Sequence, residues 1–248
     1  MNATIAGLGV VILGAILTLG FAAIYRKKPM RDLRDFPAFN RLRRAMGLAV
    51  EDGSRLHISL GNASMTNPGN ASALVGFSVL KRVAQLSSMS DRPPVVTSGD
   101  GALSILSQDS LAEAYHQANA MDQYDPNRGF LAGVTPFSYA AAALSVIHDP
   151  NVSGNILIGN YGPEAALLAD AADQEHAYML AASDGLQAQA VLYASAQDPL
   201  IGEELFASGA YLHAGRMHTA SLHAQDILRL VMILALVVGA VLKLAGVL

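Results

Sequence analysis

Residues 56–60 read LHISL and residues 61–70 read GNASMTNPGN, and this pair of segments decides the fold. The first five residues predict a short strand, and the following ten, rich in glycine, asparagine and serine, predict a turn. A helical pattern then covers residues 71–88. A strand, a polar turn and a helix in this order form the first half of a βαβ unit.

The same order recurs along the chain. Four more strands are predicted at Val95–Thr97, Phe130–Val134, Asn155–Ile158 and Tyr178–Ala181. The further helices are predicted at Ala102–Ala120, Pro136–His148, Pro163–Gln174, Leu186–Ala196 and Pro199–His213. Strands separated by helices indicate a parallel sheet that is covered on both faces. The sequence therefore predicts an α/β fold with a doubly wound, mostly parallel sheet, Rossmann-like or flavodoxin-like, and leaves the strand order open.

Several helix starts carry local signals. Thr135 and Asp198 each precede a proline, so each is predicted to cap a helix whose first residue is that proline. Asp184 and Gln187 have the spacing of a capping box.

Two apolar segments bracket this α/β region. Ile5–Tyr25 contains no charged residue, and Leu230–Leu248 contains only Lys243. Each is about as long as a helix that crosses a bilayer. The chain as a whole is 52% hydrophobic and only 15% charged, with a mean hydropathy of +0.34. We therefore predict that transmembrane helices flank the α/β domain and that the lipid bilayer is a partner.

The charges around the first apolar segment predict the topology. Residues 1–4 are uncharged, whereas eight of the sixteen basic residues follow the segment within nineteen positions. By the positive-inside rule, the N-terminus lies outside and the domain lies in the cytoplasm of a two-pass protein of the inner (plasma) membrane. The expected divisions are a transmembrane helix at 1–25, a basic juxtamembrane linker at 26–46, a cytoplasmic domain at 47–225 and a second transmembrane helix at 226–248.

Net charge and cysteine content exclude several classes of function. Gly47–Gln225 carries six basic and seventeen acidic residues, a net of −11, which makes nucleic acid an unsuitable partner. An acidic body of this kind is expected to be held away from an anionic membrane surface. The absence of cysteine excludes disulfides, thiolate metal sites and a cysteine nucleophile.

The predicted strands all run into small polar turns, which meet at the carboxyl edge of a parallel sheet, where ligands normally bind. The candidate ligand-binding residues there are Asn62, Ser64, Thr66, Asp100, Asn160 and Asp184. The same residue types also satisfy the ordinary needs of any βα turn, so a purely structural role stays open. These turns contain no lysine, arginine or histidine and no phosphate-binding glycine motif, so no nucleotide or other cofactor is expected.

A catalytic set is not evident, and no catalytic or metal-binding residue is assigned. The chain lacks a G-x-S-x-G motif. Asp100, Glu164 and Asp184 are the candidate carboxylates for a magnesium or calcium site, but they belong to three different turns.

Two groups of residues are candidates for oligomer contacts. Glu203 and Glu204 lie in an otherwise apolar helical segment, where they either face solvent or pair with an arginine of a neighbouring chain, such as Arg128 or Arg216. In the apolar termini, Gly14, Thr18 and Gly239 are small residues that allow membrane helices to approach closely.

Three strings carry a resemblance to a known family. They are LHISLGNASMTNPGNASALVGFSVL at 56–80, DRPPVVTSGD at 91–100 and DPLIGEELFASGAYLHAG at 198–215. They resemble an uncharacterised family of bacterial membrane proteins that is classed as a domain of unknown function. The resemblance supports the architecture and implies no activity, cofactor or catalytic residue.

Three functions are consistent with these patterns. The first is a non-enzymatic, membrane-anchored assembly or scaffold protein that forms a homo-oligomer, for example a ring, through its cytoplasmic domains. The second is a membrane-tethered module that binds or senses a small polar ligand at the carboxyl edge. The third, less favoured, is a metal-assisted hydrolase at the same edge.

Overall fold

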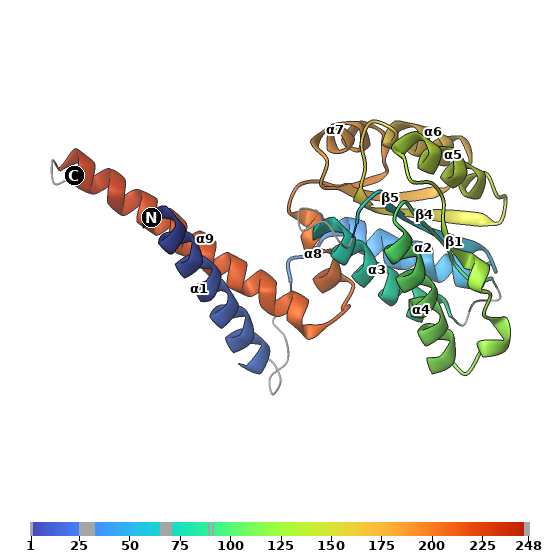
Figure 1. The fold of residues 1–248 in the computed structure, drawn as a ribbon, viewed down its shortest axis with the longest axis horizontal. Helices are drawn as coiled ribbons and strands as arrows, with labels where there is room; N and C mark the ends of the chain where they lie inside the picture. The colour runs from blue at the N-terminus through green and yellow to red at the C-terminus, as the bar shows by residue number, and fades with distance from the viewer. Residues whose placement is uncertain (1, 25–32, 65–70, 89, 91, 246–248) are drawn as a thin grey trace. The chain divides into compact units, whose positions relative to one another are not determined.

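The computed structural model describes residues 2–24, 33–64, 71–88, 90 and 92–245. The chain divides into two units, each described here by itself: Met1–Leu33 with Gly215–Leu248, and Arg34–Ala214. The first unit contains two long apolar helices, and the second is the α/β unit (Figure 1).

The α/β unit is built on a six-stranded parallel sheet. Its strands are β1 (Arg55–Gly61), β2 (Val95–Ser98), β3 (Gly129–Leu131), β4 (Val152–Asn160), β5 (Tyr178–Ser183) and β6 (Asp198–Leu200). Their order across the sheet is β3-β2-β1-β4-β5-β6, with every neighbouring pair parallel. This confirms the predicted fold class, and the order is that of the Rossmann fold.

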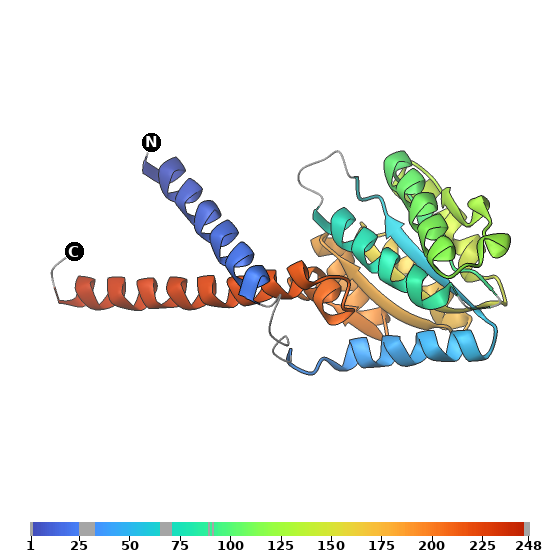
Figure 2. The same cartoon turned by 90° about the horizontal axis from the view of Figure 1, so that it is seen from below.

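Seven helices among the described residues cover the two faces of this sheet. They are α2 (Pro37–Glu51), α3 (Ala71–Ser87), α4 (Gly101–Gln117), α5 (Pro136–Ile147), α6 (Ala165–Gln174), α7 (Leu186–Ser195) and α8 (Glu204–Tyr211). Helices α5, α6 and α7 lie on one face, and the others lie on the opposite face (Figure 1). The view from below shows α2, α3 and α4 along that second face (Figure 2).

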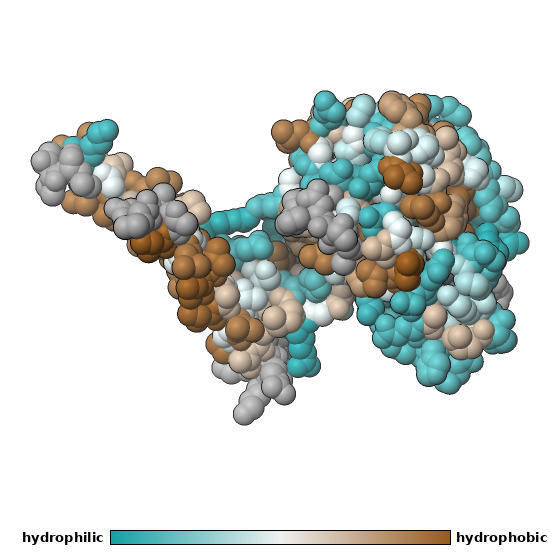
Figure 3. Space-filling model, viewed as in Figure 1, coloured by the Kyte–Doolittle hydropathy of each residue, from teal (hydrophilic) through white to brown (hydrophobic). Residues whose placement is uncertain are grey.

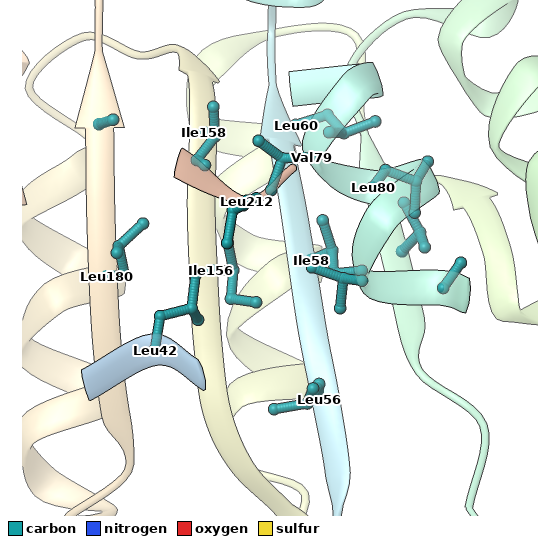
Figure 4. Close-up of a cluster of buried hydrophobic side chains, with 14 of the residues drawn as sticks. Leu42, Leu56, Ile58, Leu60, Val79, Leu80, Ile156, Ile158, Leu180 and Leu212 are labelled. Atoms are coloured by element: carbon teal, nitrogen blue, oxygen red, sulfur yellow. The ribbon is translucent and has the colours of Figure 1, made fainter. Parts of the chain in front are cut away.

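The core on the α2–α3 face is made by alternate residues of the central strands. Leu56, Ile58 and Leu60 of β1 all point to this side, where they meet leucines, isoleucines and valines of neighbouring elements (Figure 4). Each of these side chains is at most 2% exposed, and burying one contributes about 1.5–3 kcal/mol. The opposite core is built mainly from the alanines and leucines of α5, α6 and α7.

Helix α2 begins within the stretch expected to be a linker and packs into the core. Its inner face buries Phe39, Leu42 and Met46, and its first residue is Pro37, a favoured helix-start position. The Arg41 guanidinium donates from Nε to both carboxylate oxygens of Asp198, at 2.9 and 3.0 Å. Asp198 is the first residue of β6, so this ion pair joins α2 to the start of that strand. Its carboxylate is buried, at 1% exposure.

The predicted helix caps had mixed outcomes. Thr135 caps α5 in a reciprocal arrangement with Ser138, as expected for a cap before proline. Asp198 does not cap a helix: it begins the edge strand β6, where Pro199 is tolerated, and the helix starts only at Glu204. The predicted capping box of Asp184 is also wrong, since Gly185 occupies the N-cap of α7 and no side chain caps it.

The other unit contains α1 (Asn2–Ile24) and α9 (Arg216–Leu244), both long and apolar enough to cross a membrane. A Cβ on Gly14 would lie 3.6 Å from Leu228 Cδ1, so the two helices pass close together at this glycine. Thr18 donates to the Gly14 carbonyl at 2.8 Å within its own helix. A Cβ on Gly239 would meet no atom within 4 Å, so its small size is not used for this contact.

Two helical glycines give a matched test of how closely α3 lies on the sheet. A Cβ at Gly76 would stand 2.6 Å from the Ile158 carbonyl oxygen, whereas one at exposed Gly47 on α2 would meet nothing within 4 Å. We expect Gly76→Ala to lower the free energy of unfolding by about 1–3 kcal/mol. Gly47→Ala is expected to raise it by up to about 1 kcal/mol, because alanine is the better helix former. Urea titration of the detergent-solubilised protein, followed by circular dichroism, measures both; equal stability of the two variants would contradict the close packing.

Candidate functional site

The strand order places a topological switch point between β1 and β4. After β1 the chain continues into α3 on one face of the sheet, and after β4 it continues into α6 on the other face. In doubly wound folds, ligands bind at the carboxyl ends of the strands at such a point. The residues that follow β1 and β4 are therefore the first candidates for a site.

Asn62 lies in the turn that follows β1. Its backbone N–H donates to the Asn160 carbonyl at 2.9 Å, which ties the ends of β1 and β4 together. Its side chain lies against Gly99, where any Cβ would overlap the Asn62 Oδ1 atom. Both amide atoms of Asn62 are buried, and among the described residues neither has a hydrogen-bond partner. A buried amide without a partner costs free energy, so it is a candidate contact for a ligand.

Asp184 connects three elements at the switch point. Its Oδ1 accepts a hydrogen bond from Asn160 Nδ2 at 2.6 Å, and its Oδ2 accepts one from Ser72 Oγ at 2.5 Å. Asp184 thereby links the end of β5 to the end of β4 and to the first turn of α3. The structure thus brings two of the predicted residues, Asn160 and Asp184, into direct contact. Sequence analysis missed Ser72, because nothing distinguishes it from other small residues at a helix start.

The remaining predicted residues have different surroundings. Asp100 is the N-cap of α4 and accepts from the Leu103 N–H at 2.9 Å, so its carboxylate serves the helix. Ser64 is half-buried in the turn after β1, and Thr66 lies outside the described residues.

A buried polar network lies under the switch point, on the α5 face of the sheet. His57 Nδ1 is 3.0 Å from Asn155 Oδ1, and His57 Nε2 is 2.8 Å from Thr97 Oγ1. Because the amide oxygen can only accept, Nδ1 donates to it and Nε2 accepts from the Thr97 hydroxyl. The Tyr139 hydroxyl continues the chain at 3.0 Å from Thr97 Oγ1.

The network then reaches the carboxyl end of β1. The Tyr139 hydroxyl lies 2.5 Å from Ser59 Oγ and accepts from the Gly61 N–H at 3.1 Å. Ser59 Oγ is 2.7 Å from the Tyr161 hydroxyl, which donates to the Ser59 carbonyl. Six side chains, five on β1, β2, β4 and α5 and one just after β4, are therefore connected from the interior of the sheet to its carboxyl edge.

Burial keeps this network uncharged. Desolvation lowers the pKa of His57 to about 4, so the imidazole is neutral at neutral pH. Desolvation likewise raises the pKa of Tyr139 and of Tyr161, so both hydroxyls stay protonated. The network holds α5 to the sheet by hydrogen bonds between neutral groups.

Glu164 precedes α6 and is almost fully buried, at 1% exposure. Its Oε1 accepts from the Gly162 N–H at 2.8 Å, and its Oε2 has no hydrogen-bond partner among the described residues. The three candidate carboxylates Asp100, Glu164 and Asp184 do not form a group among the described residues. In the part of the chain that the structure describes, no three histidines or carboxylates lie together so that they could hold a metal ion.

The predicted oligomer contacts on α8 are partly used within the chain. Glu204 Oε2 accepts from the Ile201 N–H at 3.0 Å at the start of α8. Arg128, one suggested partner, pairs with Asp125 of its own chain at 3.2 Å. A contact of Glu203 or Glu204 with a neighbouring chain stays a prediction.

A group of exposed apolar side chains surrounds the carboxyl edge. We call it the apolar rim; its members are Leu74, Ile105, Val134, Phe137 and Leu186. They lie in or next to the first turns of α3, α4, α5 and α7, and their exposure ranges from 58% to 82%. Elsewhere among the described residues of Arg34–Ala214, only Tyr193 has a large apolar or aromatic side chain exposed above 55%. The visible surface of this unit is otherwise mostly hydrophilic (Figure 3).

These observations define a class of protein: a parallel α/β unit of Rossmann strand order, with terminal helices that could span a membrane. The chain belongs to the family described as a domain of unknown function (DUF6754), whose model matches residues 2–248. Neither a curated protein nor a solved structure matches this chain. This confirms the resemblance to a family of unknown function with apolar helices at both ends.

The buried histidine gives a pH test of the network. Because the pKa of His57 is about 4 when folded and about 6.5 when unfolded, the unfolded state binds more protons between these values. The free energy of unfolding should therefore fall by about 3 kcal/mol as the pH drops from 6.5 to 4, over and above the change contributed by other groups. His57→Gln cannot take up this proton, so the wild-type loss should exceed the loss in the variant. Parallel pH dependences of wild type and variant in urea titrations would contradict a buried neutral histidine.

Proposed function

We propose that this protein is a membrane-anchored, non-enzymatic assembly protein whose α/β units associate into a homo-oligomer, such as a ring. The apolar rim is the observation that carries the proposal. Exposed apolar groups gathered on one edge of a unit that is otherwise polar are typical of a protein–protein contact. Four of the five rim residues lie in helices that pack against the sheet, so their side chains are presented on a rigid base.

The composition of the rim suits a contact between copies. Residues 34–214 carry nine basic and eighteen acidic residues, so two copies repel one another over most of their surface. The rim residues are uncharged, and interface cores are depleted in charge. Two membrane helices would hold the copies in one plane, which raises their effective concentration. A contact of modest affinity is then enough to form the oligomer.

The expected topology belongs to this proposal. Eight basic residues follow the first apolar helix and none precedes it. This asymmetry favours an inner (plasma) membrane protein with its N-terminus outside and its α/β unit in the cytoplasm.

Charged substitutions in the rim test the assembly. Phe137→Asp with Leu186→Asp places one carboxylate in the first turn of α5 and one in the first turn of α7. The helix dipole favours negative charge at these positions, so both helices should remain folded. We expect the detergent-solubilised wild type to be an oligomer and this double variant to be a monomer by light scattering.

Tyr193→Lys is the matched control, because Tyr193 is similarly exposed on α7 but lies outside the rim. It should leave the oligomer intact. A wild type that is strictly monomeric would refute the proposal, and a rim variant that stays oligomeric would assign the assembly to the membrane helices instead.

A second candidate, a small-ligand binding or sensing module, is favoured by the unpartnered amide of Asn62 at the switch point. The described turns at this edge contain no basic side chain. We therefore expect a neutral molecule with hydroxyl or amide groups. The hydrolase alternative has less support, because the described residues hold no metal-binding group of three.

Asn62→Leu separates this role from a structural one. Leucine is close to asparagine in size and removes a buried amide without a partner, so the ligand-free protein should become more stable by about 1–3 kcal/mol. Thermal-shift screening with polyols, nucleosides and amino acids should find a compound that stabilises the wild type but not Asn62→Leu. Gln117→Ala on the exposed end of α4 should respond like the wild type. A screen in which no compound raises the melting temperature would remove support for this candidate.

A further inference from the structure

Helix α2 presents an arginine face, which we define as Arg41, Arg43 and Arg44. All three side chains are exposed, while Phe39 and Leu42 on the inner side of the helix are fully buried. The arginines are thus fixed to the α/β unit by the packing of α2 against the sheet.

Helix α2 carries three of the nine basic residues of the unit. Three other cations are in ion pairs: Lys81 with Glu113 at 3.1 Å, Arg55 with Asp149 at 3.3 Å and Arg128 with Asp125 at 3.2 Å. Arg82 donates to the Leu212 carbonyl at 3.0 Å, and Arg92 donates to Asn151.

Among the arginines of α2, Arg41 is paired with Asp198, whereas Arg43 and Arg44 have no carboxylate partner among the described residues. Arg43 contacts only the neutral Asn40 side chain and the Phe39 carbonyl, and Arg44 has no partner among the described residues. The rest of the unit, residues 45–214, carries five basic and seventeen acidic residues. The arginine face is therefore a positive surface on an acidic body.

A hollow of about 670 Å³ lies beside the arginine face. Its lining includes Arg41, Arg44, Ala45, Leu48, Tyr178 and Asp198. Asp198 holds Arg41 in place and raises the pKa of that guanidinium, first through the hydrogen bond and then through its charge. The Arg44 guanidinium, which has no partner among the described residues, lies beside apolar side chains and suits a phosphate group that is attached to an apolar or glycerol body.

We propose that the arginine face of α2 docks on the anionic headgroups of a lipid bilayer. The positive arginine face is complementary to negatively charged headgroups. The chain that joins α1 to α2 is also short enough to keep α2 near the bilayer. Only twelve residues separate Ile24 at the end of α1 from Pro37 at the start of α2, so the tether spans at most about 40 Å. Five of these residues, Arg26, Lys27, Lys28, Arg31 and Arg34, are themselves basic.

This docking changes the expectation that the acidic body is held away from the membrane. Because α2 is part of the folded core, lipid contact through α2 orients the whole α/β unit. Each basic residue near an anionic surface strengthens attachment about fivefold, so two arginines together contribute about 25-fold.

The test uses the full-length protein in nanodiscs. The chain contains no cysteine, so Leu48→Cys provides a single labelling site on α2, beside Arg44 in the hollow. A fluorophore at this site is quenched by a small fraction of lipid that carries a nitroxide on its headgroup. We expect at least about twofold more quenching in discs that contain phosphatidylglycerol than in discs of phosphatidylcholine alone. High salt should remove the difference, because it screens surface charges.

Variants separate lipid docking from simple proximity. Arg43→Gln with Arg44→Gln should abolish the dependence on phosphatidylglycerol, whereas Arg43→Lys with Arg44→Lys should retain most of it. Both positions are exposed, and circular dichroism verifies that the variants remain folded. A reporter at Tyr193→Cys on α7 should show no such dependence. Equal quenching of the α2 reporter in both lipid mixtures, or quenching that is unaffected by the glutamine pair, would overturn the proposal.

Discussion

The close approach of β1, β4 and α3 is the constraint on which the rest of the α/β unit depends. At Gly159 a Cβ would overlap the Leu60 carbonyl, and at Gly76 it would lie 2.6 Å from the Ile158 carbonyl oxygen. Without side chains at these two positions, α3 lies directly on the central strands. Its first turn then reaches Asp184, and the Ser72 hydroxyl can donate to that carboxylate at 2.5 Å. The geometry of the switch point is thus a consequence of how closely the backbone packs beneath it.

The two faces of β1 are held by different forces. Leu56, Ile58 and Leu60 enter an apolar core, whereas His57 and Ser59, which alternate with them, enter a hydrogen-bonded network. Such a network costs least free energy in the interior when its members are satisfied and neutral. The low pKa of His57 meets the second requirement. One member, the Asn155 Nδ2 atom, has no partner among the described residues, so the network is not fully satisfied.

Sequence alone predicted the features that depend on local patterns. The alternation of strands and helices and the cap at Thr135 are set within a few residues, and both were confirmed. The failures involve partners that are distant in sequence. Asp198 resembles a helix cap locally, but it pairs with Arg41, 157 positions away, and starts a strand instead. Helix α2 was missed because its arginines suggested a linker. At the site, the meeting of Asn160 and Asp184 follows from parallel strand ends, whereas the roles of Ser72 and Gly99 arise only from the approach of other segments.

The proposed surfaces differ in chemistry in a way that keeps their partners distinct. The apolar rim gains most from contact with another apolar surface, because removing its side chains from water is favourable regardless of charge. The arginine face gains from anions, and salt weakens its contacts. A unit tethered by two apolar helices meets both kinds of partner continuously, so neither contact needs high intrinsic affinity. Assembly and lipid docking can therefore act on the same α/β unit without competing for the same residues.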